Sequence, residues 1–295
     1  MPTGMHAMKL IRYACYAMLA TSSVGLAKDV KELDGGDTIT VPLSDQARPA
    51  TLHIGLVMGG ITVTGRDIKD VIVEVRGGSS NGDRRYRDEA RGLRRVLPAA
   101  PVVSVEEQNN RVEIVSPAGN RPVYLDIQVP RKTNLEISTV NSGNIEVQGV
   151  DGELELGNVN GAIELEDVSG AVVAHTVNGR VLATLSRVTP DKPMAFTSLN
   201  GVVDVTLPAA IKSNIKLRTD NGSAYTDFEL KMLPQPDAIE DTGRSRGRYR
   251  INVNKMIYGS VNGGGPDIEM RTFNGNIYLR KGEASSTPGV KPRQP

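Results

Sequence analysis

The sequence predicts an all-β fold: a single-stranded β-helix, or β-solenoid, which we expect to be right-handed and to carry two irregular Arg-rich loop insertions. Three observations predict it. Glycines recur at a nine-residue period from 143 to 179, Asn-Gly dipeptides mark alternate units, and apolar residues alternate with polar ones in between. A period of two indicates a β-strand with one buried face. The best candidate helix, Tyr86 to Leu97, is too charged and contains Gly92.

The composition suits short strands joined by tight turns around an aliphatic core. The 295 residues include 31 Gly, 17 Pro, three Phe and no Trp, and 39% are hydrophobic. A single Cys excludes disulfides and thiolate metal cages within one chain. With 35 basic and 34 acidic residues the formal net charge is +1, which gives no indication of nucleic-acid binding.

The segment at positions 1–27 is predicted to be a signal peptide. Lys9 and Arg12 supply positive charge, positions 13–20 are apolar, and small residues precede the expected cleavage site after Ala27. The apolar run is shorter than the roughly 20 residues that cross a bilayer, so we expect no transmembrane segment in the mature chain. The one cysteine falls within this leader. A cysteine-free mature chain suits the periplasm or the extracellular space.

Seven segments ahead of the regular repeats are rich in Val, Ile and Thr with interleaved polar residues, which predicts strands. We interpret residues 36–130 as less regular N-terminal coils, with Thr38–Val57 sealing the end. The predicted strands are Thr38–Leu43, Thr51–Val57, Ile61–Thr64, Val71–Arg76, Val102–Glu106, Arg111–Val115 and Val123–Val129.

The regular repeats begin at Leu135–Val140 and are expected to continue to residue 280. The third residue after a repeat glycine is polar in the first three units, so Glu146, Glu155 and Glu164 are expected to point outward. The second and fourth residues are apolar in every unit, which places them inside. The repeat glycines are Gly143, Gly152, Gly161, Gly170 and Gly179. The expected inward residues are Ile145, Val147, Leu154, Leu156, Ile163, Leu165, Val172, Ala174, Val181 and Ala183.

Asn-Gly dipeptides predict sharp corners, because both residues tolerate positive φ. One interpretation is a string of β-hairpins, for which Asn-Gly is a strong signal. The other is a solenoid, in which equivalent corners stack and their Asn side chains form a ladder along the axis. The nearly constant spacing of the corners from Asn160 to Asn221 favours the solenoid. The corners are Asn160-Gly161, Asn178-Gly179, Asn200-Gly201, Asn221-Gly222, Asn262-Gly263 and Asn274-Gly275, and Asn141-Ser142-Gly143 is an expanded version.

Further strands are predicted after the clear repeats, and the solenoid domain is expected to span residues 28–281. The glycine run Gly263 to Pro266 is expected to bend the chain near the final coil, and residues 282–295 read as a disordered tail. The predicted strands are Gly201–Leu207, Asn214–Arg218, Tyr249–Val253, Asp267–Met270 and Asn276–Leu279.

Two long interruptions, residues 77–101 and 231–250, break the pattern. Their arginines could bind an anionic partner such as lipopolysaccharide phosphate, teichoic acid or an acidic glycan, because Arg holds such groups bidentately. The other interpretation is a solvated excursion, as for most charge runs. The candidate binding residues of the first loop are Arg84, Arg85, Arg87, Arg91, Arg94 and Arg95. The second loop carries Arg244, Arg246, Arg248 and Arg250.

The run from Val129 to Ala183, which contains VNSGNIEV, NVNGAIEL and TVNGRVLA, resembles the bacterial putative adhesin family, whose members repeat such Asn-Gly strand units. The segment Gly259 to Leu279, GSVNGGGPDIEMRTFNGNIYL, resembles that family's closing coils. The resemblance implies a single-stranded β-helix and an envelope or secreted location. It brings no catalytic motif. The two Arg-rich interruptions depart from the family pattern.

Little in the sequence indicates catalysis. Outside the predicted leader only His53 and His175 remain, and a lone His within a structural repeat does not support a Ser-His-Asp triad. The chain lacks a nucleophile elbow, a phosphate loop, a zincin helix and EF-hand spacing. We therefore expect no enzymatic activity, no cofactor and no metal.

The enzymatic alternative uses the outward carboxylates, because paired Asp or Glu residues cleave glycosidic bonds. One coil apart, Glu146 and Glu164 would lie near the spacing of about 4.8 Å between paired strands and would repel each other unless solvent or a cation intervened. The other interpretation is a solvated acidic strip that keeps the surface soluble.

The sequence thus predicts a non-catalytic, exported β-solenoid that acts as a binding or structural, adhesin-like surface in the bacterial cell envelope. A polysaccharide-binding or polysaccharide-cleaving β-helix is the alternative. The expected partner is an envelope glycan or another envelope protein and not nucleic acid, and the oligomeric state is open.

Overall fold

The computed structural model describes residues 38–77, 103–116, 122–141, 143–234, 239–245, 248–253 and 256–282. These residues form strands and turns without a helix, which confirms the all-β prediction. Within the same ranges, no helical segment has the length and apolar character needed to cross a bilayer. The predicted signal peptide and residues 283–295 of the predicted tail lie outside the described residues.

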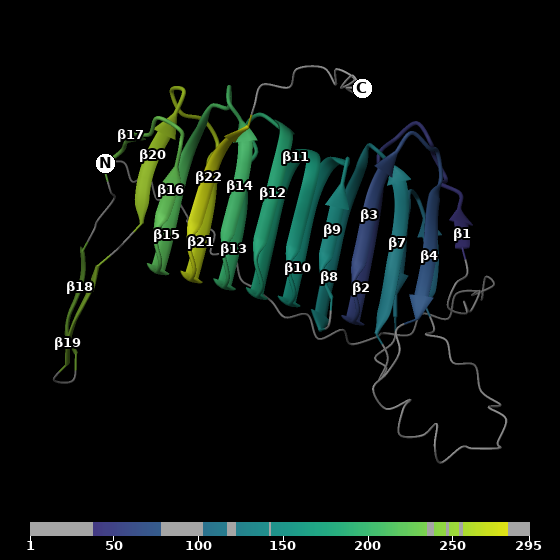
Figure 1. The fold of residues 1–295 in the computed structure, drawn as a ribbon, viewed down its shortest axis with the longest axis horizontal. Helices are drawn as coiled ribbons and strands as arrows, with labels where there is room; N and C mark the ends of the chain where they lie inside the picture. The colour runs from purple at the N-terminus through teal and green to yellow at the C-terminus, as the bar shows by residue number, and fades with distance from the viewer. Residues whose placement is uncertain are drawn as a thin grey trace, which may run out of the picture. The chain divides into compact units, whose positions relative to one another are not determined.

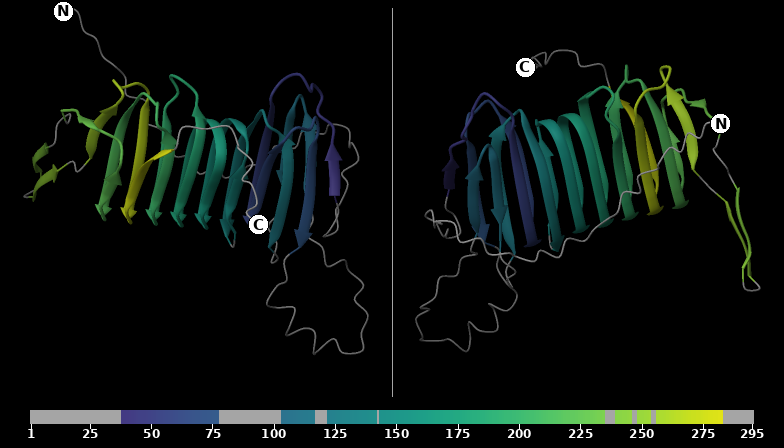
Figure 2. Two further views of the ribbon diagram at one scale, coloured as in Figure 1. Left: turned by 45° about the horizontal axis from the view of Figure 1, so that its top comes forward. Right: turned by 180° about the vertical axis from the view of Figure 1, so that it is seen from behind.

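Twenty of the strands in the described residues belong to one continuous sheet. Its strands run in two rows, joined where β11 turns from one row into the other. We call these row A and row B (Figures 1 and 2). The central strands of row A are β2 (Ala50–Met58), β8 (Thr133–Asn141), β10 (Asp151–Asn160), the second half of β11 (Ile163–Asn178), β13 (Met194–Asn200), β21 (Asp267–Asn274) and β15 (Ser213–Asn221). Those of row B are β7 (Val123–Pro130), β3 (Ile61–Arg66), β9 (Ile145–Gln148), the first half of β11, β12 (Val181–Val188), β14 (Val203–Pro208), β22 (Ile277–Gly282) and β16 (Ala224–Thr226).

Neighbouring central strands pair in parallel, each with its equivalent in the next coil. Ile145 pairs with Ile163, and Ile163 pairs with Val181, so each step is one full coil of the repeat. In row A, Gly152 pairs with Gly170 at the same step. Hairpins would have given antiparallel neighbours, so the hairpin interpretation is wrong for these coils.

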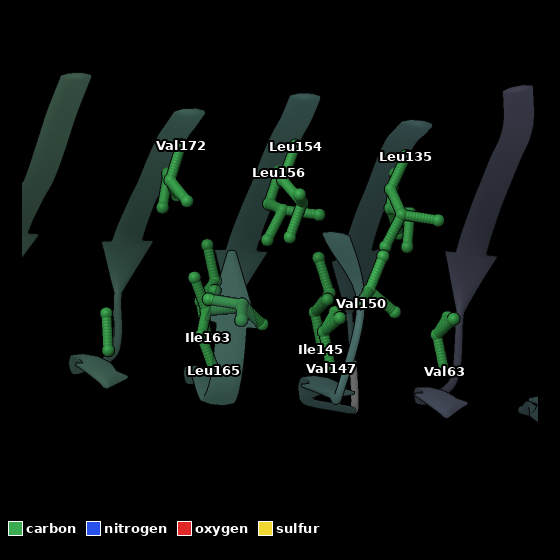
Figure 3. Close-up of a cluster of buried hydrophobic side chains, with 14 of the residues drawn as sticks. Val63, Leu135, Ile145, Val147, Val150, Leu154, Leu156, Ile163, Leu165 and Val172 are labelled. Carbon is green, nitrogen blue, oxygen red and sulfur yellow. The ribbon is translucent and has the colours of Figure 1, made fainter. Parts of the chain in front are cut away.

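The inner faces of the two rows enclose one aliphatic core. All ten residues predicted to point inward in the regular repeats are buried, and Ile145, Ile163, Val172 and Val181 have no exposed surface. Figure 3 shows Leu135, Leu154 and Val172 of row A pointing toward the side chains of row B. Burying one such side chain contributes roughly 1.5–3 kcal/mol, so the core grows with every added coil.

The N-terminal end is closed by antiparallel strands. In row B, β4 (Val71–Gly77) pairs with β7 and with β1 (Thr38–Val41). In row A, β5 (Ser104–Gln108) pairs with β6 (Arg111–Val115), which lies against β2. The expectation that Thr38–Val57 seals this end is correct only for its first strand, because β2 is stacked inside between β6 and β8.

The C-terminal coil is inserted between two earlier ones. Strand β21 pairs with β13 on one side and with β15 on the other, and β22 lies likewise between β14 and β16. Figure 1 shows these yellow strands between green ones. The expected closing coil at Gly259 to Leu279 is therefore an internal coil, and the turn at Gly263 to Pro266 precedes an insertion and not an end.

The second predicted loop, residues 231–250, contains strands. β17 (Lys231–Met232) pairs antiparallel with β20 (Ile257–Val261), which in turn covers the edge of β15. β18 (Ile239–Ser245) and β19 (Arg248–Val253) form a separate antiparallel pair. The prediction of an irregular loop was wrong here, because β18 and β19 contain β-branched residues that favour strands, namely Ile239, Thr242, Ile251 and Val253.

Candidate binding surfaces

The asparagines of the corners form the predicted ladder. Asn178 Nδ2 donates to Asn160 Oδ1 over 2.8 Å, and Asn200 Nδ2 donates to Asn178 Oδ1 over 2.9 Å. Because the last coil is inserted, Asn274 donates to Asn200 and accepts from Asn221. The complete ladder is Asn141, Asn160, Asn178, Asn200, Asn274 and Asn221. These amides are satisfied by one another, so the ladder is primarily a structural feature.

Asn262-Gly263 is not part of the ladder, contrary to the expectation. Asn262 has φ of 50° and its amide donates to the carbonyl of Ile211 over 2.7 Å. It fixes the turn that leads from β20 into β21. The dipeptide marks a turn here too, but its asparagine binds a backbone carbonyl and not the asparagine of a neighbouring coil.

A second ladder, which was not predicted from the sequence, is mostly buried. Thr176 Oγ1 donates to the carbonyl of Gly161 over 2.9 Å, and Ser198 Oγ donates to that of Gly179 over 2.8 Å. The detectable signal was a Thr, Ser or Asn two positions before every corner asparagine. The full set is Thr139, Asn158, Thr176, Ser198, Thr272 and Thr219.

The outward carboxylates divide between the two rows. Glu146 and Glu164 are register partners on row B, as predicted, whereas Glu155 lies on row A beside Glu136. Arg180 Nη2 lies 2.7 Å from Glu164 Oε1 and offsets its charge. The three predicted glutamates therefore do not form one cluster. Glu146 and Glu164 remain neighbours, and they belong to a longer row of outward residues on row B that also contains Thr62.

A cleft of about 730 Å³ lies on the outer side of row B. Tyr124 of β7 lines it with an exposed ring, and a Cβ on Gly60 would lie 3.3 Å from that ring. Glu146 of β9 and Asn144 line the adjacent side. The volume lies within the range of about 300–1,000 Å³ that is usual for ligand sites.

The charge in this cleft is negative. Arg76 of β4 forms ion pairs with Asp126 and with Glu74, so its charge is shared by two carboxylates. Glu146 has no hydrogen-bond or ion-pair partner among the described residues. Carboxylates of this kind accept hydrogen bonds from hydroxyl groups and repel anions.

A second hollow, of about 320 Å³, continues from the cleft along row B. Thr62 and Glu146 line both hollows, and the second extends past Glu164 to Leu182. Register pairing then leads from Leu182 through Asp204 to Tyr278 and Tyr225. We call this outward row, Tyr124, Asp126, Thr62, Glu146, Glu164, Leu182, Asp204, Tyr278 and Tyr225, the row B track.

The far end of the row B track is aromatic. The rings of Tyr225 and Tyr278 stack with centroids 5.3 Å apart and an interplanar angle of 12°. The Arg280 guanidinium lies over Tyr278 and binds both oxygens of Asp204, at 2.7 and 2.9 Å. That bidentate pair raises the pKa of Arg280.

The two histidines are placed apart. His53 Nδ1 lies 3.2 Å from Glu136 Oε2, and Arg111 Nη2 lies 2.8 Å from the same oxygen. The hydrogen bond from Arg111, helped by His53, lowers the pKa of Glu136 against the effect of partial burial. His175 is exposed, and its ring lies where a side chain on Gly157 would be.

The Arg-rich candidates are not tested by the structure. Arg84, Arg85, Arg87, Arg91, Arg94 and Arg95 lie outside the described residues, which end at Gly77 and resume at Val103. Within the described ranges, no group of three or more His, Asp or Glu side chains is placed to hold a metal ion.

Comparison with known proteins gives structural neighbours but no match of family or sequence. No protein-family model matches the chain, and no curated protein matches its sequence. A putative cell adhesion protein from Clostridium sporogenes has a TM-score of 0.44 and 13% identity, over 86% of this chain and 100% of that one. A putative adhesin from Bacteroides fragilis has a TM-score of 0.34 and 12% identity, over 87% and 100%.

A third neighbour, a putative adhesin from Parabacteroides merdae, has a TM-score of 0.24 and 8% identity, over 83% of this chain and 96% of that one. The neighbours are thus described as putative adhesins or cell adhesion proteins, the class that the repeats resemble.

Proposed function

We propose that this chain is an exported, non-catalytic binding protein of the bacterial cell envelope, and that the row B track binds an uncharged polysaccharide. The observation that supports it most directly is the cleft at Tyr124, where an exposed aromatic ring stands beside carboxylates and an amide. Aromatic faces bind the apolar C–H faces of sugars, and the polar groups bind their hydroxyls.

The length and charge of the row B track fit an extended, neutral ligand. Six strand steps separate β7 from β22, which at about 4.8 Å each is roughly 29 Å. The hollows at Glu146 and Glu164 carry more negative than positive charge, which disfavours phosphorylated or acidic glycans. The anionic partner considered for the Arg-rich loop would need a different surface.

We also propose that the chain is not catalytic, because carboxylates of the row B track are held in ion pairs with arginines. Glycosidic cleavage needs one carboxyl group as an acid and a second as base or nucleophile. Asp126 is bound by Arg76 and Glu164 by Arg180, so each would have to leave its arginine to attack a sugar. Glu146 and Glu166, which line the second hollow, would then bind hydroxyl groups without cleaving the chain.

The finer description of the fold belongs to the same proposal. We propose that the stacked coils form a right-handed single-stranded β-helix. Parallel pairing of each strand with its equivalent in the next coil supports the helix, and right-handed crossovers are the rule between parallel strands. Export to the periplasm or beyond is supported by the leader-like segment at positions 1–27.

Calorimetric titration with neutral and acidic oligosaccharides of increasing length tests the binding proposal. We expect neutral chains to bind with affinity that rises with length, and Tyr124→Ala to weaken binding at least tenfold. Tyr225→Ala should affect only the longer chains. The control is Val173→Ala, an exposed site on row A that should bind like the wild type. Preference for acidic chains, or wild-type affinity in Tyr124→Ala, would contradict the proposal.

The same mixtures test the proposed lack of catalysis. Prolonged incubation should release no new reducing ends and no unsaturated sugars. Release that is lost in Glu146→Gln would establish the polysaccharide-cleaving alternative.

A further inference from the structure

An exposed apolar stripe runs along the outer face of row A, one residue before the asparagine ladder. Its members lie between register partners on neighbouring strands. Val159 and Val177 lie between the pairs Asn158–Thr176 and Asn160–Asn178, and Leu199 and Phe273 lie between Ser198–Thr272 and Asn200–Asn274. Val140 and Val159 lie likewise between the pair Thr139–Asn158 and the hydrogen-bonded Asn141 and Asn160. Five of its six members expose 37–46% of their surface, and Val177 is half-buried. The stripe consists of Val57, Val140, Val159, Val177, Leu199 and Phe273.

Such a stripe is unusual on a surface that faces water. Scattered apolar residues need no explanation, but a contiguous row of six indicates an interaction surface. Outward polar residues flank it on both sides, because the asparagine ladder lies at one edge and a row of small and polar residues at the other. The stripe ends at Asp220 of β15, which lies beside Phe273 between the register pairs Thr219–Thr272 and Asn221–Asn274.

We propose that the stripe is the interface between two copies of this chain, packed face to face with their solenoid axes antiparallel. A two-fold axis parallel to the strands and centred between β10 and β11 sets each stripe on the other. Val159 then faces Val177 of the second copy, Val140 faces Leu199, and Val57 faces Phe273. Such an interface is self-complementary, as two-fold symmetry requires.

The charges beside the stripe complement each other in this arrangement. The next charged row runs from Glu113 and His53 at one end to Glu269 and Lys216 at the other. The two-fold sets Lys216, which also binds Asp267 of its own copy, against Glu113 of the second copy, and Glu269 against His53, whose ring can donate a hydrogen bond. No two like charges face each other in this row, because Glu136 meets Ala195 and Glu155 meets Val173.

The shapes complement each other as well. The row beside the stripe has Gly55 and Ser138 at its N-terminal end and Thr197 and Arg271 at its C-terminal end. In the antiparallel arrangement Arg271 faces Gly55 and Thr197 faces Ser138. A Cβ on Gly55 would have Ser138 Oγ as its nearest neighbour, 3.9 Å away, so the space above this glycine is open.

Cross-linking of single-cysteine variants tests the proposal on the full chain with Cys15→Ser. Val159 lies one strand spacing from its own copy along the axis, about 4.8 Å, whereas Phe273 lies five spacings, roughly 24 Å, from its own. A short bismaleimide should therefore cross-link Val159→Cys to itself and leave Phe273→Cys monomeric. A mixture of Val57→Cys and Phe273→Cys should give a cross-linked heterodimer.

Light scattering provides the independent readout. The wild type should have twice the monomer mass, and Leu199→Lys should have the monomer mass with an unchanged circular dichroism spectrum. The control Leu182→Lys, on the outer side of row B, should remain a dimer. A wild-type monomer would overturn the proposal. If the Val159→Cys thiol of that monomer reacted with a maleimide, the stripe would be exposed and would fit another partner protein. If the thiol did not react, a segment of this chain would cover the stripe. Self-cross-linking of Phe273→Cys would equally contradict the proposal.

Discussion

At the residue scale, the corners depend on glycine because neighbouring coils approach too closely for a side chain. A Cβ on Gly179 would lie 2.0 Å from the carbonyl oxygen of Gly161, and one on Gly201 would lie 1.9 Å from that of Gly179. Neither glycine has positive φ, so the requirement is space and not backbone conformation. Steric contact therefore explains the glycines at these corners, whereas Gly170 in addition has a positive φ of 120°.

We expect Gly179→Ala to destabilise the fold by at least about 1–3 kcal/mol, the usual cost of overpacking. Urea unfolding measures it. Gly55→Ala is the matched control, because the same methyl group there has no atom nearer than 3.9 Å and should change the free energy of unfolding by less than about 1 kcal/mol. Equal losses in the two variants would contradict the proposal that close approach of neighbouring coils requires glycine at the corners.

At the element scale, one carboxylate joins three neighbouring strands at the N-terminal end of row A. Glu136 of β8 contacts His53 of β2 and Arg111 of β6. Its pKa is lowered in the folded state, chiefly by the hydrogen bond from Arg111. A carboxyl group whose pKa is lowered on folding stabilises the folded state fully at pH values above its unfolded pKa of about 4.3. This stabilisation is lost as the pH falls through the pKa of the folded state.

The wild type should therefore lose more stability between pH 5 and pH 3 than Glu136→Gln does, by a small amount that salt reduces, since both partners are largely exposed. Urea midpoints across this range measure the difference. Arg111→Met should flatten the same acid slope. If Arg111→Met kept the full wild-type slope, the Arg111 hydrogen bond would not be its cause.

At the scale of the whole molecule, the coil was predictable but its order was not. Alternation of apolar and polar residues placed Ile163 inside and Glu164 outside, and repeating corners indicated parallel stacking. Asn274-Gly275 and Asn221-Gly222 are the same dipeptide. The sequence therefore does not indicate that the coil of Asn274 is stacked between those of Asn200 and Asn221. Local patterns specify what a coil is and leave open which coil it meets.

The cleft at Tyr124 could not be predicted either, because local sequence patterns do not specify which strands are neighbours. Tyr124 and Glu146 meet in one cleft because β7 and β9 both pair with β3, a strand that lies far ahead of them in the chain. Glu146 was predictable from its place in a repeat, whereas Tyr124 lies in a strand that belongs to no repeat and so carries no such signal. Long-range pairing of this kind leaves no periodic signal.

Disulfide trapping with Cys15→Ser tests the stacking order most directly. In the inserted arrangement Asp204 is the register partner of Tyr278, whereas Tyr225 lies one strand farther away. Directly paired strands lie about 4.8 Å apart, within disulfide reach, and strands two steps apart lie at roughly 9.6 Å, beyond it. The pair Asp204→Cys with Tyr278→Cys should oxidise readily, and Asp204→Cys with Tyr225→Cys should stay reduced. The reverse result would show coils stacked in simple chain order, and oxidation of neither pair would contradict parallel stacking at this end.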